Sequence, residues 1–207
     1  MSKTKYPVII FEGIEASGKS TNINNFAKYL KQNNYKFIKI REPGGSDFSE
    51  KIRKLMLKNN TNLNAKTDLL LVMASRSENI DKILNKHYQK KIILIDRFSD
   101  STIAYQHYGM GLNLKMIKLL NSFVVGKFKP NLTFLCSVNK KKMFQRLSSR
   151  SRTNRYDTFK FKFYDKVGKG FEKLSKNKTN YVLLESDKST QKENLNKIIK
   201  AFKKIIN

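Results

Sequence analysis

The sequence predicts an α/β fold of the P-loop type: a three-layer sandwich in which one parallel sheet of about five strands carries helices on both faces. Three observations support this prediction. Apolar segments of strand length alternate with longer segments of helical periodicity. Each predicted strand is almost wholly apolar, as expected for a strand that is covered on both faces. A glycine-rich turn lies between the first predicted strand and the first predicted helix.

The predicted elements follow from these patterns. Five segments are rich in Ile, Val, Leu and Phe and are predicted to be strands: 7–12, 36–41, 91–96, 131–137 and 181–185. Six segments have apolar residues at helical spacing and are predicted to be helices: 19–33, 66–88, 113–126, 140–149, 158–175 and 191–206. In the first of them, Ile23, Phe26 and Leu30 fall on one face. Strands and helices in this order indicate a parallel sheet.

Length and composition indicate one cytoplasmic domain. The chain has 207 residues, shows no internal repeat and no proline-rich linker, and is therefore predicted to form a single domain over 1–207. Its longest apolar runs are far shorter than the roughly 20 residues of a transmembrane helix, so we expect no membrane partner. Glu12 ends the first apolar run before a signal-peptide core could form. The single cysteine, Cys136, excludes an intramolecular disulfide and a multi-cysteine zinc site, which suggests a reducing compartment.

The charge balance is strongly basic, with 43 Lys and Arg against 16 Asp and Glu and a formal net charge of +27. Such a charge favours polyanion binding in general. Here the lysines are scattered along the whole chain, without the basic and aromatic alternation of a single-strand-binding surface, so nucleic acid is not the expected partner. Only eight of the basic residues are arginines, and each is therefore a candidate for a site that needs a planar, bidentate donor.

The clearest motif is a phosphate-binding loop at 13–20, GIEASGKS, which fits G-x-x-x-x-G-K-[ST] between a strand and a helix. The glycines let successive backbone amides point inward, Lys19 can reach the β- and γ-phosphates, and Ser20 can hold Mg²⁺. The motif predicts that the chain binds a nucleoside triphosphate. The expected nucleotide-binding residues in this loop are Gly13, Ala16, Ser17, Gly18, Lys19, Ser20 and Thr21.

Further segments follow in a specific order: REPGG at 41–45, Ala74-Ser75-Arg76 on a predicted helix, IDRF at 95–98 and STIAYQ at 101–106. In order and spacing this set resembles the thymidylate kinase family, and the resemblance covers nearly the whole chain, from 11–13 to 146–155. It implies transfer of the γ-phosphoryl group of ATP to dTMP, with Mg²⁺, in deoxynucleotide biosynthesis. It also implies a homodimer built from helix faces.

The acceptor phosphate and the metal are expected at the edge of the sheet. Arg41 and Arg97 follow parallel strands at the end where open α/β sheets bind ligands, and two guanidinium groups suit a monophosphate dianion. The resemblance implies that they hold the acceptor in line with the donor. Asp96 ends a buried strand, where a lone carboxylate is costly unless it has a task, so we expect it and Ser20 at the metal. Lys19, Asp96 and Arg97 are candidate catalytic residues.

The remaining acceptor contacts rest on the resemblance alone. It implies that Arg76 hydrogen-bonds the base, that Thr102 and Gln106 contact the base edge, that Tyr105 packs under the sugar, and that Glu15 contacts the 3′-hydroxyl.

One acceptor position departs from the family pattern. Val72 stands where the family usually has a phenylalanine stacked on thymine, and a valine offers no aromatic face. Base identity is therefore the open part of the interpretation. The alternatives are a kinase for another deoxynucleoside monophosphate or a deoxynucleoside and, from another class, a nucleic-acid-binding NTPase.

An arginine-rich stretch is predicted to form a lid at about 146–157, with the sequence RLSSRSRTNR over its first ten residues. Mobile arginines that close over phosphates can offset charge on the transferred oxygens. The phosphate-binding loop has no basic residue between its two glycines, which resembles the bacterial-type enzymes, whose catalytic arginine lies in the lid. The resemblance places Arg146 on the donor adenine, and Arg150 and Arg155 are the expected catalytic phosphate contacts. Arg53 receives no role.

Overall fold

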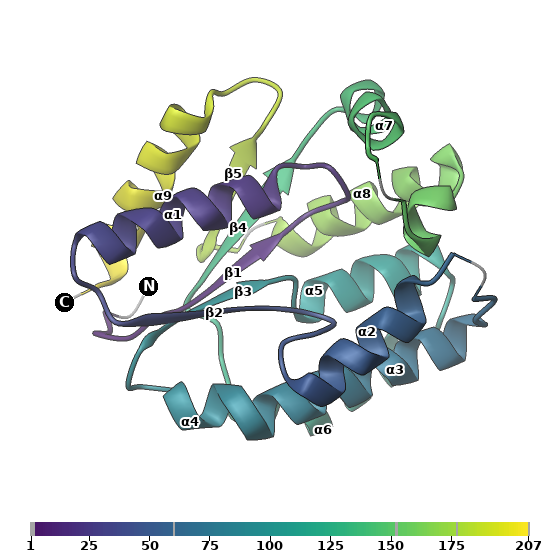
Figure 1. Ribbon diagram of the computed structural model, residues 1–207, viewed down its shortest axis with the longest axis horizontal. Coiled ribbons are helices and arrows are strands. Elements are labelled where there is room, and N and C mark those ends of the chain that lie inside the picture. Colours follow the sequence, from purple (N-terminus) through teal and green to yellow (C-terminus); the bar gives the residue numbers. More distant parts are fainter. Residues whose placement is uncertain (1–2, 60, 152, 177, 207) are drawn as a thin grey trace.

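A computed structural model describes residues 3–59, 61–151, 153–176 and 178–206 (Figure 1). Its centre is one five-stranded parallel sheet with the order β2-β3-β1-β4-β5, which confirms the predicted fold class. All five predicted strands are present, with these bounds: β1 Val8–Glu12, β2 Phe37–Arg41, β3 Ile92–Asp96, β4 Leu132–Ser137 and β5 Tyr181–Glu185. Within the described residues, no helix is long and apolar enough to cross a membrane.

Helices cover both faces of the sheet. On one face lie α1 (Lys19–Gln32) and α9 (Gln191–Ile205) (Figure 1). They pack on the strands through a cluster that includes Phe26 and Phe202. Alternate residues of the strands supply the opposite face, where Ile10 and Ile95 meet Ile80 and Leu84. Successive side chains of a strand point to opposite faces, so a strand buried on both sides must be apolar throughout. This explains why the central strands β1, β3 and β4 are continuous apolar runs, whereas the edge strands β2 and β5 are only partly buried.

The long helix predicted over 66–88 is helical throughout but not uniform. It consists of α3 (Ala65–Asn79), a π-helical turn η1 (Ile80–Leu84) and the short α4 (Asn85–His87). The other predicted helices correspond to α6 (Leu114–Val125), α7 (Lys140–Ser148) and α8 (Phe161–Ser175). A single 3₁₀ turn, η3 (Arg155–Thr158), precedes α8.

Two helical segments were not predicted. The first is α2 (Asp47–Leu57), which begins at an N-cap formed by the Ser46 side chain and carries Asp47 and Glu50 in its first turn. Those residues are start signals for a helix, so the sequence held the information. The second is α5 (Ser99–Thr102) with its π-helical continuation η2 (Ile103–Gly109). Its polar residues Ser101, Thr102 and Gln106 are buried like its apolar ones, so the contrast between an apolar and a polar face that marks a surface helix could not reveal it.

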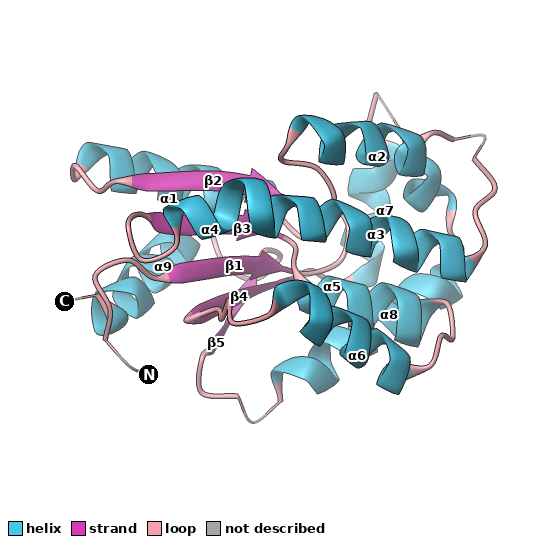
Figure 2. Cartoon of the chain, turned by 90° about the horizontal axis from the view of Figure 1, so that it is seen from below, coloured by secondary structure: helices cyan, strands magenta, loops and turns pink. Residues whose placement is uncertain are grey.

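The strands run toward the end of the molecule that carries α2, α3, α7 and α8 (Figure 2). The register aligns Arg41 of β2 with Asp96 of β3, and Phe11 of β1 with the same Asp96, so these strands end at one level. The loops that leave this edge therefore converge. This is the edge at which open parallel sheets bind ligands.

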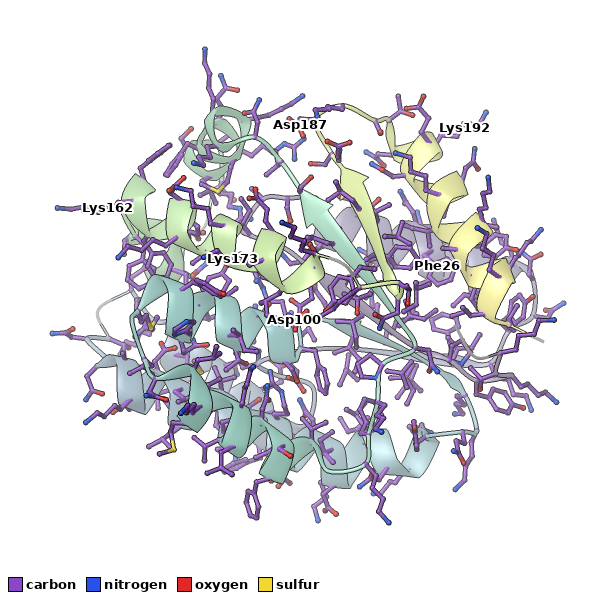
Figure 3. All side chains as sticks on the ribbon, turned by 180° about the vertical axis from the view of Figure 1, so that it is seen from behind. Phe26, Asp100, Lys162, Lys173, Asp187 and Lys192 are labelled. Carbon is purple, nitrogen blue, oxygen red and sulfur yellow. The ribbon has the colours of Figure 1, made fainter. Side chains whose placement is uncertain are left out.

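The surface and the core differ sharply in charge. Lys162 and Lys173 on α8 and Lys192 on α9 are exposed and lie on the outside of the helices (Figure 3). Phe26 points into the core between α1 and the sheet (Figure 3). Cys136 of β4 is also buried in this core, and burial raises the pKa of its thiol to about 12.

Candidate active site

The loops at the C-terminal edge of the sheet enclose a cavity of about 610 Å³. Its wall is formed by five groups of residues: the phosphate-binding loop with the start of α1, the segment after β2 with α2, α3, the segment from the end of β3 into η2, and the lid together with the start of α9. Of the residues predicted for the site, it is lined by Glu15, Ala16, Ser17, Gly18, Lys19, Ser20, Thr21, Val72, Arg76, Asp96, Arg97, Thr102, Tyr105, Gln106, Arg146 and Arg150. Gly13, Arg41 and Arg155 are not part of the lining.

The glycines of the phosphate-binding loop are required by its geometry. Gly13 has φ +139°, and a Cβ there would lie 2.1 Å from the carbonyl oxygen of Cys136. Gly18 has φ +85° and immediately precedes α1. A side chain at Gly13 would therefore displace β4 from β1, and a side chain at Gly18 would strain the helix start. Although Gly13 does not face the cavity, it shapes the loop that does.

Lys19 is folded over its own loop. Its Nζ donates hydrogen bonds to the carbonyl oxygens of Gly13 at 2.9 Å and Ile14 at 2.7 Å, and the side chain is 7% exposed. Burial and the nearby charge of Arg97 lower the pKa of Lys19 to about 8. The ammonium is thus held over the loop by two carbonyl oxygens, and an anion bound beside it would raise its pKa toward the ordinary value.

Ser20 and Asp96 form a possible metal-binding pair. The Ser20 hydroxyl donates to Asp96 Oδ2 at 3.4 Å, and both residues line the cavity. Among the residues that the structure describes, Asp96 Oδ1 is buried and has no hydrogen-bond partner. A hydroxyl beside an unsatisfied carboxylate oxygen is a donor set that suits Mg²⁺, which uses few protein ligands and keeps phosphate and water oxygens.

Arg97 lies at the centre of the acceptor end. It adopts φ +69°, and its guanidinium donates to Gly13 O at 2.9 Å, to Ser101 Oγ at 3.2 Å and to Glu15 Oε2 at 2.7 Å. The Tyr105 hydroxyl donates to the same Glu15 carboxylate, and the Tyr105 ring lies 5.0 Å from the guanidinium. Burial raises the pKa of Glu15, but the charges of Arg97 and Lys19 outweigh it and hold that pKa below its ordinary value.

Arg76 of α3 is almost fully buried, at 1% exposure, yet borders the cavity. Its Nε donates to Glu42 Oε2 at 2.6 Å and its Nη1 to Asn121 Oδ1 at 2.7 Å, while the guanidinium lies 5.0 Å from the Phe98 ring. A buried guanidinium needs such partners because an uncompensated charge is costly. Glu42 and Asn121, which fix the plane of Arg76, were missed in the sequence, since neither lies in a contiguous motif with it.

Two arginines lie elsewhere than the sequence suggests: Arg41 does not line the cavity, whereas Arg53 does. Arg41 is turned outward: its side chain is 54% exposed and pairs with Glu50 at 2.9 Å. Arg53, which received no role, lines the cavity from α2 and donates to Pro43 O at 2.8 Å. Burial and the neighbouring charge of Arg41 lower the pKa of Arg53. The scarcity of arginine in this lysine-rich chain was a signal that could have marked Arg53.

Three further residues complete the acceptor wall. Val72 lies beside Ile52 and Met56 of α2. An aliphatic cluster therefore occupies the place where the family usually has a phenylalanine. Thr102 Oγ1 and Gln106 Oε1 are buried and have no hydrogen-bond partner among the described residues. Unpaired polar atoms at a cavity wall are candidates for contacts with the edge of a ligand.

The arginines of the lid lie in three different environments. Arg146 donates to the carbonyl oxygen of Ala16 at 2.8 Å and to that of Ser186 at 3.1 Å, which fixes its guanidinium beside the donor loop. Arg150 lines the cavity and pairs with Asp157 at 3.0 Å. Arg155, expected to contact phosphate, instead points away into a buried ion pair with Asp68. Arg152 lies outside the described residues.

The phosphate-binding loop lies at the edge of a parallel sheet, and arginines from α2, α3, the end of β3 and the lid line the same cavity. This arrangement defines the class of P-loop nucleotide kinases. The family model for thymidylate kinase matches residues 11–198. The chain belongs to the thymidylate kinase family and is a phosphotransferase that uses ATP.

Known relatives and a solved structure support this assignment. The chain is 37% identical over 182 residues to a thymidylate kinase of Thermosipho africanus, covering 87% of this chain and 90% of that protein. It is 40% identical over 172 residues to a thymidylate kinase of Wolbachia pipientis, covering 81% and 84%. The crystal structure of a thymidylate kinase from Ehrlichia chaffeensis matches with a TM-score of 0.78 at 30% identity, over 96% of this chain and 99% of that one.

Proposed function

We propose that this chain phosphorylates dTMP to dTDP with ATP as donor and Mg²⁺ as metal, and thereby contributes to the supply of dTTP. The observation that carries the proposal is the single cavity wall that joins Lys19 of the donor loop to Arg76 and Arg97 of the acceptor end. The cavity, of about 610 Å³, extends from the donor loop to these acceptor residues. Phosphoryl transfer depends chiefly on such positioning and on offsetting charge.

At the donor end, the amides of residues 13–21 bind the phosphates of ATP and Lys19 neutralises charge at the β- and γ-oxygens. Ser20 and Asp96 would hold Mg²⁺, which would offset the negative charge of the donor phosphates. Arg146 stacks on adenine, because its guanidinium is already fixed in a plane beside the loop.

At the acceptor end, Arg97 and Arg53 bind the phosphate of dTMP, with Arg41 as an outer partner that could turn inward only by leaving Glu50. Tyr105 and Glu15 hold the sugar, and their mutual contact keeps both side chains in place. No general base is required, since the acceptor phosphate is already ionised at neutral pH and can attack the γ-phosphorus directly.

The base is held by Arg76, Thr102 and Gln106, with Val72 as an aliphatic wall. In the lid, Arg150 is the residue best placed to reach the transferred group, since it borders the cavity. Arg155 supports the lid from outside the cavity through Asp68. A single domain over 1–207 and a cytoplasmic location stay predictions.

The experiment that tests the function is an assay of ADP release with ATP and Mg²⁺ across dTMP, dUMP, dCMP, dGMP and thymidine. We expect the highest kcat/KM for dTMP. A preference for another acceptor would place the chain with a different substrate. If no acceptor supports turnover, a gel shift with DNA and RNA at physiological salt tests the nucleic-acid NTPase that the charge of +27 suggests.

We also propose a homodimer formed through α3 and α6. These helices expose Leu70, Met116, Leu119 and Phe123, and the groove between them is almost wholly apolar. An apolar patch of this kind on a highly charged protein favours self-association. Small-angle scattering should give twice the mass of the chain, and Leu119→Lys should reduce the measured mass to that of one chain. A monomeric wild-type protein would exclude the dimer.

A further inference from the structure

A buried carboxylate lies just behind the cavity wall. Asp68 is in the first turn of α3, has 0% exposure and does not itself line the cavity. No motif in the sequence marks it, and so far it has appeared only as the ion-pair partner of Arg155. Burying a carboxylate is costly unless hydrogen bonds compensate, so its partners show what it is held for.

Three side chains from two distant segments donate to this carboxylate. Gln106 Nε2, from η2, donates to Oδ1 at 2.7 Å. The Tyr156 hydroxyl donates to Oδ1 at 3.0 Å and to Oδ2 at 2.9 Å, and Arg155 forms an ion pair with Oδ2. Gln106 belongs to the acceptor wall, whereas Arg155 and Tyr156 belong to the lid. Asp68 therefore joins the base-contacting wall to the lid through one group.

The carboxylate also decides which atom Gln106 offers to a ligand. An ionised carboxylate can only accept hydrogen bonds, so Gln106 must turn its NH₂ group toward Asp68. The remaining polar atom, Oε1, has no partner among the described residues and is an acceptor. Arg76, on the same wall, can only donate. A donor beside an acceptor matches the O4 and N3–H edge of thymine or uracil and opposes cytosine, whose N4 donates and whose N3 accepts.

The lid side of the contact leads to the arginine that borders the cavity. Arg155 and Tyr156 begin η3, and Asp157, in the same turn, accepts from Arg150 at 3.0 Å and closes a capping box with Asn154. Holding η3 on Asp68 thus fixes the position of Asp157 and, through it, that of Arg150. Burial raises the pKa of Tyr156 to about 12, so its hydroxyl stays a donor across the physiological range.

We propose that Asp68 is a positioning residue that fixes Gln106 as a hydrogen-bond acceptor for the pyrimidine base and anchors the lid to the same wall. Base selection and lid placement then depend on one buried carboxylate. The proposal rests on the proposed function, because it assumes that a pyrimidine monophosphate occupies the acceptor end.

The test uses Asp68→Asn and measures the inhibition constants of dUMP and dCMP against dTMP. Both inhibitors lack the 5-methyl group, so their ratio reports only the N3 and position-4 edge. Because an asparagine can donate as well as accept, Gln106 becomes free to rotate, and we expect the preference for dUMP over dCMP to fall about tenfold. KM for ATP should stay within about twofold, since the hydrogen bonds to the Asp68 carboxylate come from Gln106, Arg155 and Tyr156 and not from the donor loop.

Two matched variants complete the test. Asp68→Glu keeps an acceptor-only group and should retain the preference for dUMP. If Asp68 acted only through its packing, this variant would lose the preference as well. Asp165→Asn removes a carboxylate of α8 that pairs with Lys140 of α7 and Lys169 of α8, and should leave both the preference and kcat unchanged. An unchanged preference in Asp68→Asn would overturn the proposal.

If Asp68→Asn fails to fold in thermal denaturation, Tyr156→Phe tests the lid arm alone. It removes one donor to Asp68 and leaves Gln106 in place, so kcat should fall about tenfold while the preference for dUMP is retained. An unchanged kcat would overturn the proposal. Failure of the proposed function would look different, because the wild-type protein would then show no turnover of dTMP at all.

Discussion

The proposed donor end of the cavity takes its phosphate-binding groups from one continuous stretch, residues 13–21, whereas the proposed acceptor end combines Glu15 of that loop with side chains from α2, α3 and the segment from the end of β3 into η2. Backbone amides and one titratable lysine dominate the donor end. Guanidinium groups held by buried partners, such as Arg76 on Glu42 and Arg97 on Glu15, dominate the acceptor end. A backbone site needs glycines at fixed spacing, whereas a side-chain site needs partners that can lie anywhere in the sequence.

The donor end should depend almost wholly on one side chain for chemistry. We expect Lys19→Ala to lower kcat by about three orders of magnitude or more, because the ammonium acts on charge that develops in the transition state. KM for dTMP should change little. Steady-state kinetics measure both, with thermal denaturation as the check of folding. Turnover within tenfold of wild type would remove Lys19 from the mechanism.

The acceptor end should respond to Arg97 and much less to Arg41. Arg97→Ala should weaken dTMP binding about a hundredfold, because the variant loses a charge-assisted contact to the phosphate and leaves the Glu15 carboxylate without its cation. ATP binding should weaken about threefold at most. Titration calorimetry of each ligand separates the two effects. Arg41→Ala, at an exposed pair, serves as the control and should weaken dTMP less than about fivefold.

The two ends should also differ in their dependence on pH. The pKa of Lys19 is lowered to about 8, so the lysine is charged below that pH and loses its proton above it. ATP affinity should therefore fall about fivefold between pH 8 and pH 9. At the acceptor end the charges of Glu15 and its neighbours raise the pKa of Arg97 despite burial, so dTMP affinity should stay flat. Lys19→Arg should abolish the pH dependence of ATP affinity. If the dependence persisted in this variant, deprotonation of Lys19 would not be its cause.

The smallest change concerns the base wall. Val72→Phe places an aromatic face where Val72 now meets Ile52 and Met56. Aromatic contact with a base should raise dTMP affinity about threefold, a part of what full stacking contributes in single-strand binders. Equilibrium binding of dTMP and dUMP measures it. A lower affinity for both would show that the space beside α2 is already filled.

The same difference explains how far the sequence could be interpreted. The strands and most helices were predictable, because burial on two faces and on one face leaves distinct apolar periods. The phosphate-binding loop was predictable as a contiguous motif. The helix α2 was missed although Ser46 caps it, and with it the place of Arg53 on the cavity wall.

What the sequence could not provide is pairing across space. Asn121 lies 45 residues from Arg76, and Asp68 lies 38 residues from Gln106. Nothing in local spacing indicates that these side chains meet, because a buried polar group needs its partner only in three dimensions. Likewise, the arginine cluster at 146–155 indicated a phosphate-contacting lid, but only the fold separates Arg150 on the cavity from Arg155 on Asp68.

The buried thiol of Cys136 makes the protein convenient for spectroscopy. With its pKa raised to about 12 and only 1% exposed, this cysteine carries almost no reactive thiolate at neutral pH. A maleimide dye will therefore label a newly introduced surface cysteine without removal of the native one. Ser148→Cys at the end of α7, paired with Lys54→Cys on α2, would report by energy transfer how far the lid travels when each nucleotide arrives.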